Sequence, residues 1–285
     1  MKIGNALNTH VKSGKIISYA DDTTIVVARD SLLDLKLTAQ TANEQFKNWC
    51  NSNQLVLNTN KTVCMYFGKS KQEIMSSTPN VSLYTKFLGT LIDDDLSWTH
   101  HIAHVCKKLS QAYYILLKLK SCVDKDALRT VYYALAYPHL SYNVMVWGAA
   151  VERNRVFMLQ KRLIRLIYDV KPKTSHKDTF IKNRILTFPS IYIYKLCMFV
   201  NANRHENYFL PLGDNHTYST RNSQVLTVPV HFTAKYERSP LYNCVKAFNA
   251  LPSDIRKIKN KNKFKAALKN YLMDQCFYKA TDMYM

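Results

Sequence analysis

Apolar residues in the first part of the chain follow two different periods. Between residues 15 and 28, two β-branched runs flank Asp21 and Asp22, a pattern typical of a β-hairpin with both carboxylates at its tip. Apolar residues then recur at spacings of three and four, which predicts a helix ending near Asn51, with Ser31 as its N-cap. Its predicted buried stripe consists of Leu32, Leu35, Ala39, Ala42, Phe46 and Trp49.

The following stretch has the short apolar runs of strands. We predict strands at 54–58 and 63–67, joined at Thr59 and Asn60, and a polar loop at 69–79. Together with the hairpin and the helix, these strands predict an α+β layer.

A second hairpin is predicted around Phe87-Leu88-Gly89, where a glycine allows close backbone approach. Asp93, Asp94 and Asp95 follow it. Nothing nearby supports a metal site there, so we interpret them as a turn before a helix.

From Thr99 onwards the pattern is helical. Residues 130–151 contain no Lys, Arg, Asp or Glu and are long enough to span a bilayer, but Pro138 and several tyrosines interrupt them. We expect two buried helices meeting at Pro138, with a membrane span as the alternative. Two further helices are predicted by apolar stripes: Ile102, Val105, Leu109, Ala112, Leu116 and Leu119, and then Val156, Leu159, Leu163 and Leu166.

The C-terminal third predicts a helix at 190–203, a short helix at 241–250 and a last helix. The apolar face of the last helix is formed by Phe264, Ala267, Leu268, Tyr271 and Leu272. Ser253 is a possible N-cap, but the lysines at 257–263 alternate with other residues, so we expect a flexible basic link there. That link either docks on nucleic acid or stays solvated.

Charge narrows the class of partner. The chain has 285 residues and a formal net charge of +20, with 47% hydrophobic residues, which excludes a disordered composition. Such a basic chain is expected to bind a polyanion, either nucleic acid or an anionic membrane surface. Its nineteen tyrosines favour nucleic acid, since tyrosine stacks on bases, although most tyrosines in a folded chain belong to its core.

Cysteine and histidine spacing argues against metal clusters. The seven cysteines include no Cys-x-x-Cys pair, which indicates reduced thiols and an intracellular protein. His100 and His104 share a helix face beside Cys106, but no second pair of ligands occurs at zinc-like spacing. We therefore expect histidines at a helix start and no zinc. No glycine-rich phosphate loop is present.

One ordered set of motifs carries a family resemblance. Tyr-Ala-Asp-Asp (19–22) is followed by Leu-Val-Leu-Asn-Thr-Asn-Lys-Thr (55–62), Phe-Leu-Gly (87–89), Leu-Ser-Trp (96–98), Trp-Gly (147–148) and Phe-Asn-Ala-Leu-Pro (248–252). This order resembles the C-terminal half of a reverse transcriptase from non-LTR (LINE-like, jockey-like) retrotransposons, over nearly the whole chain. The string Tyr218-Ser219-Thr220-Arg221 also resembles one in that family, with no assigned role.

The resemblance implies a partial palm, a helical thumb and a helical C-terminal extension. The implied segments are a palm at 1–75, a primer-grip-like connector at 76–98, a thumb at 99–170, a connector at 171–240 and a basic helical segment at 241–285. In the intact enzyme a palm strand with another metal-binding Asp precedes these segments. We expect this chain, as a truncated reading frame, to be inactive alone.

The resemblance also implies the site residues. Asp21 and Asp22 would bind Mg²⁺ and carry out catalysis, although a plain Asp-Asp turn is the alternative. Lys61 would protonate the leaving pyrophosphate or stay solvated. Nucleic acid would be contacted by Tyr19, Ala20, Phe87, Leu88, Gly89, Lys107, Lys108, Lys118, Lys161, Arg162 and Arg165, or the basic helix faces would be merely solvated.

The implied function is RNA-directed DNA synthesis with two Mg²⁺ ions. Its partners would be an RNA template, a DNA primer and deoxynucleoside triphosphates, with no membrane and no obligate protein partner. An active element would place the product in cytoplasm and nucleus. The alternatives are a non-catalytic nucleic-acid-binding remnant that keeps the basic thumb, and a degenerate product that never folds stably.

Overall fold

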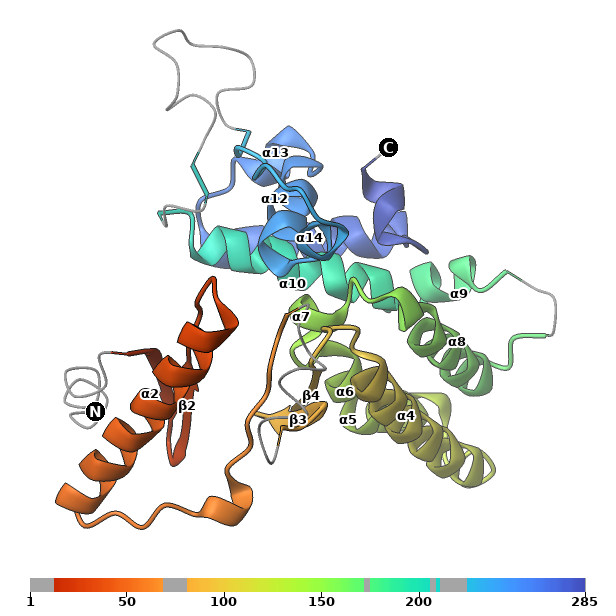
Figure 1. Ribbon diagram of the computed structural model, residues 1–285. Helices are drawn as coiled ribbons and strands as arrows, with labels where there is room; N and C mark the ends of the chain where they lie inside the picture. The colour runs from red at the N-terminus through yellow and green to blue at the C-terminus, as the bar shows by residue number, and fades with distance from the viewer. Residues whose placement is uncertain (1–12, 69–80, 172–174, 206–208, 211–224, 285) are drawn as a thin grey trace, which may run out of the picture. The chain divides into compact units, whose positions relative to one another are not determined.

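The computed structural model describes residues 13–68, 81–171, 175–205, 209–210 and 225–284 (Figure 1). The chain forms two compact units, residues 1–83 and 84–285. Within the described residues there are twelve α-helices and two separate two-stranded hairpins. The α+β character is thus confirmed, with helices predominating. The five-segment division stays a prediction.

The first unit consists of a hairpin and one long helix. Strands β1 (Lys15–Tyr19) and β2 (Asp22–Val26) pair antiparallel, and α2 (Leu32–Ser52) follows. Ser31 caps α2 as predicted, since its side chain accepts a hydrogen bond from the Asp34 N–H. Its core is small, and the buried apolar residues are Ile16, Ala42, Trp49 and Cys50. Of the predicted stripe of α2, only Ala42 and Trp49 are buried, and Ala39 is exposed.

The predicted strands at 54–58 and 63–67 are wrong. The first is irregular, and the second takes part only in an isolated bridge between Cys64 and Val81. The turn between them is a 3-10 helix, η1 (Thr59–Lys61), capped by Asn58. A strand needs a neighbour for its backbone groups, and the described residues supply none for 54–58, where Val56 is 98% exposed. The predicted loop at 69–79 lies outside the described residues.

The second unit begins with a hairpin of β3 (Tyr84–Phe87) and β4 (Thr90–Asp93), as predicted at Phe87-Leu88-Gly89. Eleven helices and two 3-10 turns follow within the described residues. They are α4 (Thr99–Leu119), α5 (Lys125–Leu135), α6 (Tyr137–Ser141), α7 (Val144–Trp147), η2 (Val151–Arg153), α8 (Asn154–Tyr168), α9 (Lys177–Lys182), α10 (Phe188–Ala202), α11 (Ala234–Glu237), α12 (Pro240–Asn249), α13 (Ser253–Arg256), α14 (Lys261–Gln275) and η4 (Ala280–Met283).

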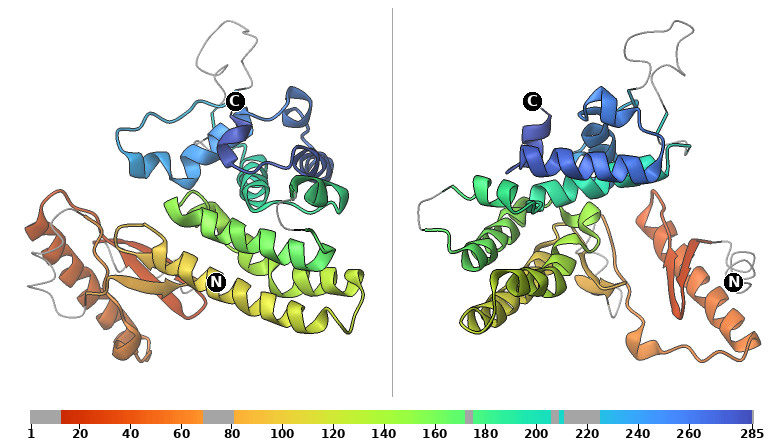
Figure 2. Two further views of the ribbon diagram at one scale, coloured as in Figure 1. Left: turned by 90° about the vertical axis from the view of Figure 1, so that its right-hand side faces the viewer. Right: turned by 180° about the vertical axis from the view of Figure 1, so that it is seen from behind.

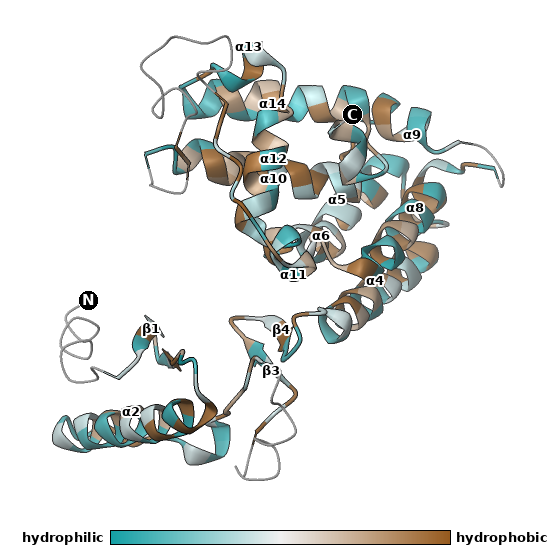
Figure 3. Cartoon of the chain, turned by 45° about the horizontal axis from the view of Figure 1, so that its top comes forward, coloured by the Kyte–Doolittle hydropathy of each residue, from teal (hydrophilic) through white to brown (hydrophobic). Residues whose placement is uncertain are grey.

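A single large core holds these helices together, with α4 and α8 side by side (Figure 2). The predicted stripe of α4 is buried from Ile102 to Leu116, and that of α8 is buried at Val156, Leu163 and Leu166. Helix α10 is apolar along most of its length (Figure 3) and lies within this core. Buried Gln160 on α8 donates to the Tyr132 hydroxyl of α5, and this polar pair fixes the two helices in register.

Motif residues of the resemblance turn out to be core residues. Trp147 is fully buried, stacks on Phe188 and donates its indole N–H to the Tyr142 carbonyl. Gly148 lies against Tyr192 so closely that a Cβ would come within 2.4 Å of the ring, which explains why only glycine fits.

Asn249 has a similar structural role. It pairs through its side-chain amide with both the N–H and the C=O of Leu226. This side chain therefore serves Leu226 as a neighbouring strand would.

Pro138 lies in the first turn of α6, directly after α5 ends, so the prediction of two helices meeting there is confirmed. No helix in the described part of the chain is long and apolar enough to cross a membrane.

The C-terminal helices are confirmed with shifted starts. Helix α10 begins at Phe188, because Pro189 is tolerated in a first helical turn. The predicted flexible link at 257–263 is partly wrong. Helix α13 forms just before it, and Asn260 caps α14 so that Lys261 and Lys263 are helical. Residues 218–221 lie outside the described part.

Candidate catalytic hairpin and nucleic-acid interface

The first hairpin presents its two carboxylates at an open tip. Tyr19 pairs with Asp22 across the strands, which leaves Ala20 and Asp21 as a two-residue loop. Ala20 has φ 51°, a left-handed conformation that costs a residue with a Cβ about 1–2 kcal/mol. Asp21 and Asp22 are exposed, and neither carboxylate has a hydrogen-bond or ion-pair partner among the described residues. Their oxygens are therefore available to a ligand.

Lys61 belongs to the same unit but has a local structural setting. It ends η1, its backbone N–H donates to the Asn58 side chain, and its own side chain is exposed. Within the described residues no hydrogen bond or ion pair joins it to Asp21 or Asp22. Its role at a leaving group stays a prediction.

The second hairpin is anchored at its turn. Leu88 and Gly89 both have positive φ, 44° and 82°, as a type I′ turn requires. The Tyr142 hydroxyl donates to the Leu88 carbonyl at 2.5 Å, and the Asn143 amide donates to the Thr90 hydroxyl at 2.9 Å. The residues that resemble a primer grip are thus held by the α6–α7 junction.

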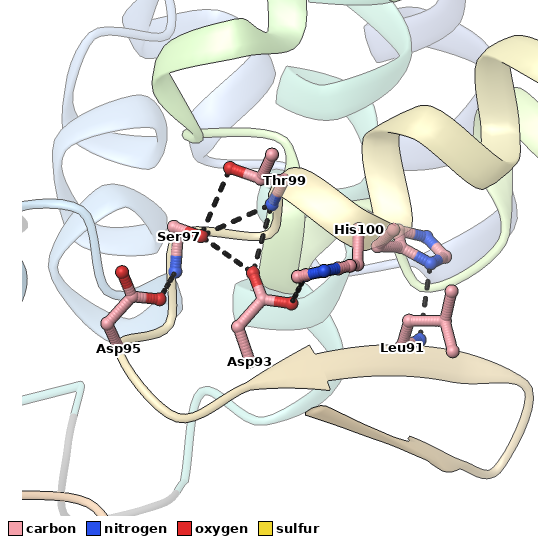
Figure 4. A network of polar contacts seen from close by, with 7 residues as sticks. Leu91, Asp93, Asp95, Ser97, Thr99 and His100 are labelled. Atoms are coloured by element: carbon pink, nitrogen blue, oxygen red, sulfur yellow. Dashed lines mark hydrogen bonds and ion pairs between the residues drawn. The ribbon is translucent and has the colours of Figure 1, made fainter. Parts of the chain in front are cut away.

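Asp93 organises the start of the bundle (Figure 4). Asp93 is 3% exposed, and its carboxylate accepts hydrogen bonds from the Ser97 hydroxyl at 2.7 Å and the Thr99 N–H at 3.0 Å. It also lies 3.0 Å from Nδ1 of His100. Trp98, the residue at the N-cap of α4, has no side-chain cap bond of its own, so Asp93 supplies the missing acceptor. The turn predicted at the three aspartates is confirmed, and its first member is a helix-capping group.

The adjacent histidines also have structural partners. His100 stacks on Tyr84, and His101 is buried, with Nδ1 accepting the Leu91 N–H at 3.3 Å. Burial, together with the charge on His104, lowers the pKa of His101 to about 4, so the ring is neutral at pH 7. These positions confirm histidines at a helix start. In the described part of the chain, no three His, Cys, Asp or Glu side chains gather in a metal-binding group.

The predicted basic residues do not share one surface. Lys107 and Lys118 lie on the outer face of α4, opposite its buried stripe, where Lys118 covers the ring of exposed Tyr114. Lys108 lies nearer His104 and His139. Burial lowers the pKa of both histidines, and the Lys108 charge lowers it further. Lys161 instead lies over the rings of Phe157 and Tyr278.

Arg162 and Arg165 line a pocket of about 430 Å³ between the C-terminal ends of α4 and α8. Its other lining residues are Tyr113, Lys120, Leu166, Asp169, Val170 and Lys171. The sequence pointed to basic residues on these helices but gave no sign that Tyr113 and Lys171 join them, because their proximity depends on how the two helices pack.

Comparison with known proteins gives a distant relationship. The chain is 23% identical over 167 residues to the RNA-directed DNA polymerase from mobile element jockey of Drosophila melanogaster. The match covers 53% of this chain but only 18% of that protein. No family model and no solved structure matches. The relationship to a non-LTR retrotransposon polymerase is therefore distant and partial.

Proposed function

We propose that this chain is the distal palm and thumb part of an RNA-directed DNA polymerase of a non-LTR retrotransposon. The observation that carries the proposal is the Tyr-Ala-Asp-Asp hairpin, whose tip holds two exposed carboxylates without protein partners among the described residues. The partial similarity to the jockey polymerase supports it. The partners would be an RNA template, a DNA primer and deoxynucleoside triphosphates.

The tip fits Mg²⁺ by its donor set. Mg²⁺ takes one or two carboxylates and keeps its other positions for water and substrate phosphates, and the free oxygens of Asp21 and Asp22 offer such ligands. Bound there, Mg²⁺ would stabilise the charge that develops in phosphoryl transfer. The protein's part is to hold both carboxylates on a short turn, with exposed Tyr19 beside them as a surface for the primer end.

The remaining predicted contacts have separate roles in this proposal. Lys61 would donate a proton to the leaving pyrophosphate once the nucleotide is bound. The anchored turn at Phe87, Leu88 and Gly89 would contact the primer backbone, because Tyr142 holds it in one conformation.

Primer extension tests the catalytic role. The chain would be assayed with Mg²⁺, an RNA template and a DNA primer, alone and joined to the preceding part of a related polymerase, since it spans only 18% of its relative's length. We expect no extension by the chain alone. In the joined protein, Asp21→Asn should lower the extension rate by roughly 10³-fold or more, because a metal ligand is removed.

Asp30→Asn is the matched control, as it removes another exposed carboxylate of the same unit. It should leave the rate unchanged. Extension that survives Asp21→Asn would refute the proposed catalytic role.

The second candidate is a non-catalytic nucleic-acid-binding protein. It is favoured by the lysines and arginines along α4 and α8, which suit phosphate contacts whether or not the hairpin is active. In that case Asp21→Asn would leave affinity for an RNA–DNA hybrid intact, and no joined protein would extend a primer.

A further inference from the structure

The pocket between α4 and α8 has an excess of positive charge. Four cations line it, from the end of α4 (Lys120), from α8 (Arg162 and Arg165) and from the chain just after α8 (Lys171), against a single carboxylate. The carboxylate, Asp169, forms ion pairs with Lys120 and with Lys125 outside the pocket. Asp169 is therefore already occupied by two lysines, and the remaining cations of the pocket lack a counter-charge among its lining residues.

Arg162 and Arg165 each contact a ring, but neither forms an ion pair with a carboxylate among the described residues. The Arg162 guanidinium lies 5.0 Å from the centre of the Tyr113 ring and has no hydrogen-bond acceptor among the described residues. Arg165 donates from Nε to Nε2 of His176 at 3.1 Å, which leaves its terminal nitrogens unused there. Because they stand three residues apart on one helix, both side chains reach the same space.

His176 fixes Arg165 only as a neutral ring. Its Nε2 must be unprotonated to accept the bond, and burial together with the charges of Arg165 and Lys161 lowers its pKa. A protonated His176 would repel the Arg165 guanidinium, so a lowered pKa of His176 agrees with the hydrogen bond between them.

Helix ends account for only part of this charge. The C-terminal ends of α4 and α8 favour nearby cations, and Lys120 at the end of α4 and Arg165 in the last turn of α8 meet that need. Arg162 lies a turn and a half before the end of α8, beyond the reach of this effect. Leu166 and Val170 are the aliphatic residues in the lining of the pocket. A multiply oxygenated anion matches such a site, since guanidinium groups bind phosphate through paired N–H donors.

We infer that this pocket binds a backbone phosphate of the nucleic-acid strand, with Arg162 and Arg165 as its principal ligands and Lys171 as a further cation. The inference rests on the proposed function for the identity of the polymer, and it adds a phosphate site at the far end of α4. That end lies about 30 Å from the β3–β4 hairpin along a helix of 21 residues. Nucleic acid held there would run along the bundle rather than touch its start alone.

The test measures binding of the full chain to a labelled 20-base-pair RNA–DNA hybrid across a salt series. We expect the double variant R162Q/R165Q to weaken binding about 10-fold or more near 0.1 M salt. The slope of log affinity against log salt should become shallower by about 0.9 for each phosphate that the variant no longer neutralises. K265Q/K269Q, which removes two exposed cations of α14, is the matched control and should change affinity less than twofold.

Folding of each variant is checked by thermal melting. The variant R162K/R165K keeps the positive charge but removes the paired N–H donors of the guanidinium groups. If the Gln variant melts early, K171Q on the exposed chain after α8 replaces it, with an expected loss of about threefold. Equal losses in the pocket and control variants would refute the site and show that only overall charge matters.

A second arm separates the sources of phosphate. Inorganic phosphate or pyrophosphate at millimolar concentration should compete with the hybrid only weakly if the site takes a strand. Strong competition would reassign the pocket to a free anion and overturn the inference. Neither outcome bears on the proposed polymerase role, which depends on Asp21 and primer extension.

Discussion

The two hairpins of this chain have similar two-residue turns, but the aspartate at a strand end is buried in one and exposed in the other. Each has a two-residue turn with positive φ at its first position, Ala20 in one and Leu88 in the other, and each has an aspartate at a strand end. In the second hairpin the turn is anchored to Tyr142 and Asp93 is buried in a capping network. In the first, the Asp22 carboxylate remains exposed, without a partner in the described part of the chain.

The difference shows what decides whether a carboxylate is bound by its own chain or stays free to bind a ligand. Asp93 is bound to donors of its own chain because α4 begins just beyond β4 and needs an acceptor at its first turn. The helix after β2 is capped by Ser31 instead, so the aspartates at the hairpin tip are not needed as helix caps. Both aspartates belong to two-stranded hairpins, and the group that packs nearby decides which of them is buried.

The largest expected effect is a pH dependence of stability at the second hairpin, where His101 contacts β4. The pKa of His101 is about 4 in the folded state and 6.5 in the unfolded state. Folding therefore favours the neutral ring, and the resulting contribution to the free energy of unfolding is fully present above pH 6.5. That stability is lost as the pH falls from 6.5 towards 4, by up to about 3 kcal/mol. Urea unfolding of wild type and H101N at several pH values measures it.

The Asn side chain can still accept the Leu91 N–H but does not titrate. The difference between the two profiles therefore isolates this one ring. Identical slopes in both proteins would mean that His101 is not held neutral by its surroundings.

A smaller effect is expected from exchanging carboxylate for amide at the two strand ends. Asp93→Asn should destabilise the second unit by about 2 kcal/mol, because charged hydrogen bonds to Ser97 and Thr99 are removed and an N–H₂ group faces donors. Asp22→Asn should leave stability within about 0.5 kcal/mol. Chemical denaturation of both variants compares them, and equal changes would remove the contrast between the hairpins.

The smallest effect concerns the turns themselves. Ala20→Gly should stabilise the first unit by roughly 0.5–1 kcal/mol, since glycine adopts a positive φ without strain. Gly89→Ala should destabilise the second by about 1 kcal/mol, with a Cβ 3.4 Å from the Tyr142 ring. Hydrogen exchange of the strand amides reads each hairpin separately, and the same sign in both would contradict the turn assignments.

The helices were predictable from sequence because each has a regular apolar stripe, and Leu109 or Leu163 needs no knowledge of its neighbour to be recognised as buried. Strands were harder. The run at 54–58 has strand composition but finds no pairing partner in the described structure, and pairing is a non-local property that a single run does not contain.

The candidate sites divide in the same way. Asp21 and Asp22 were predictable as an exposed hairpin tip from fourteen contiguous residues. The pocket was not, because Lys120 and Arg162 meet only through the packing of α4 on α8. The pattern of basic residues predicted which helices carry them but not which face of the bundle each one lies on. It therefore grouped Lys107 with Arg165, although they lie on different surfaces.

The amide of Asn249 has a consequence for how this chain can vary. Leu226 is held by that side chain, and the N–H of the next residue, Thr227, donates to the Leu210 carbonyl, so the two ends of the intervening stretch are joined. Once such ends are joined, doubling the length between them costs only about 0.6 kcal/mol in loop-closure entropy. An epitope or a small domain inserted between Leu210 and Leu226 should therefore leave the helical unit folded, which offers a place to label the protein.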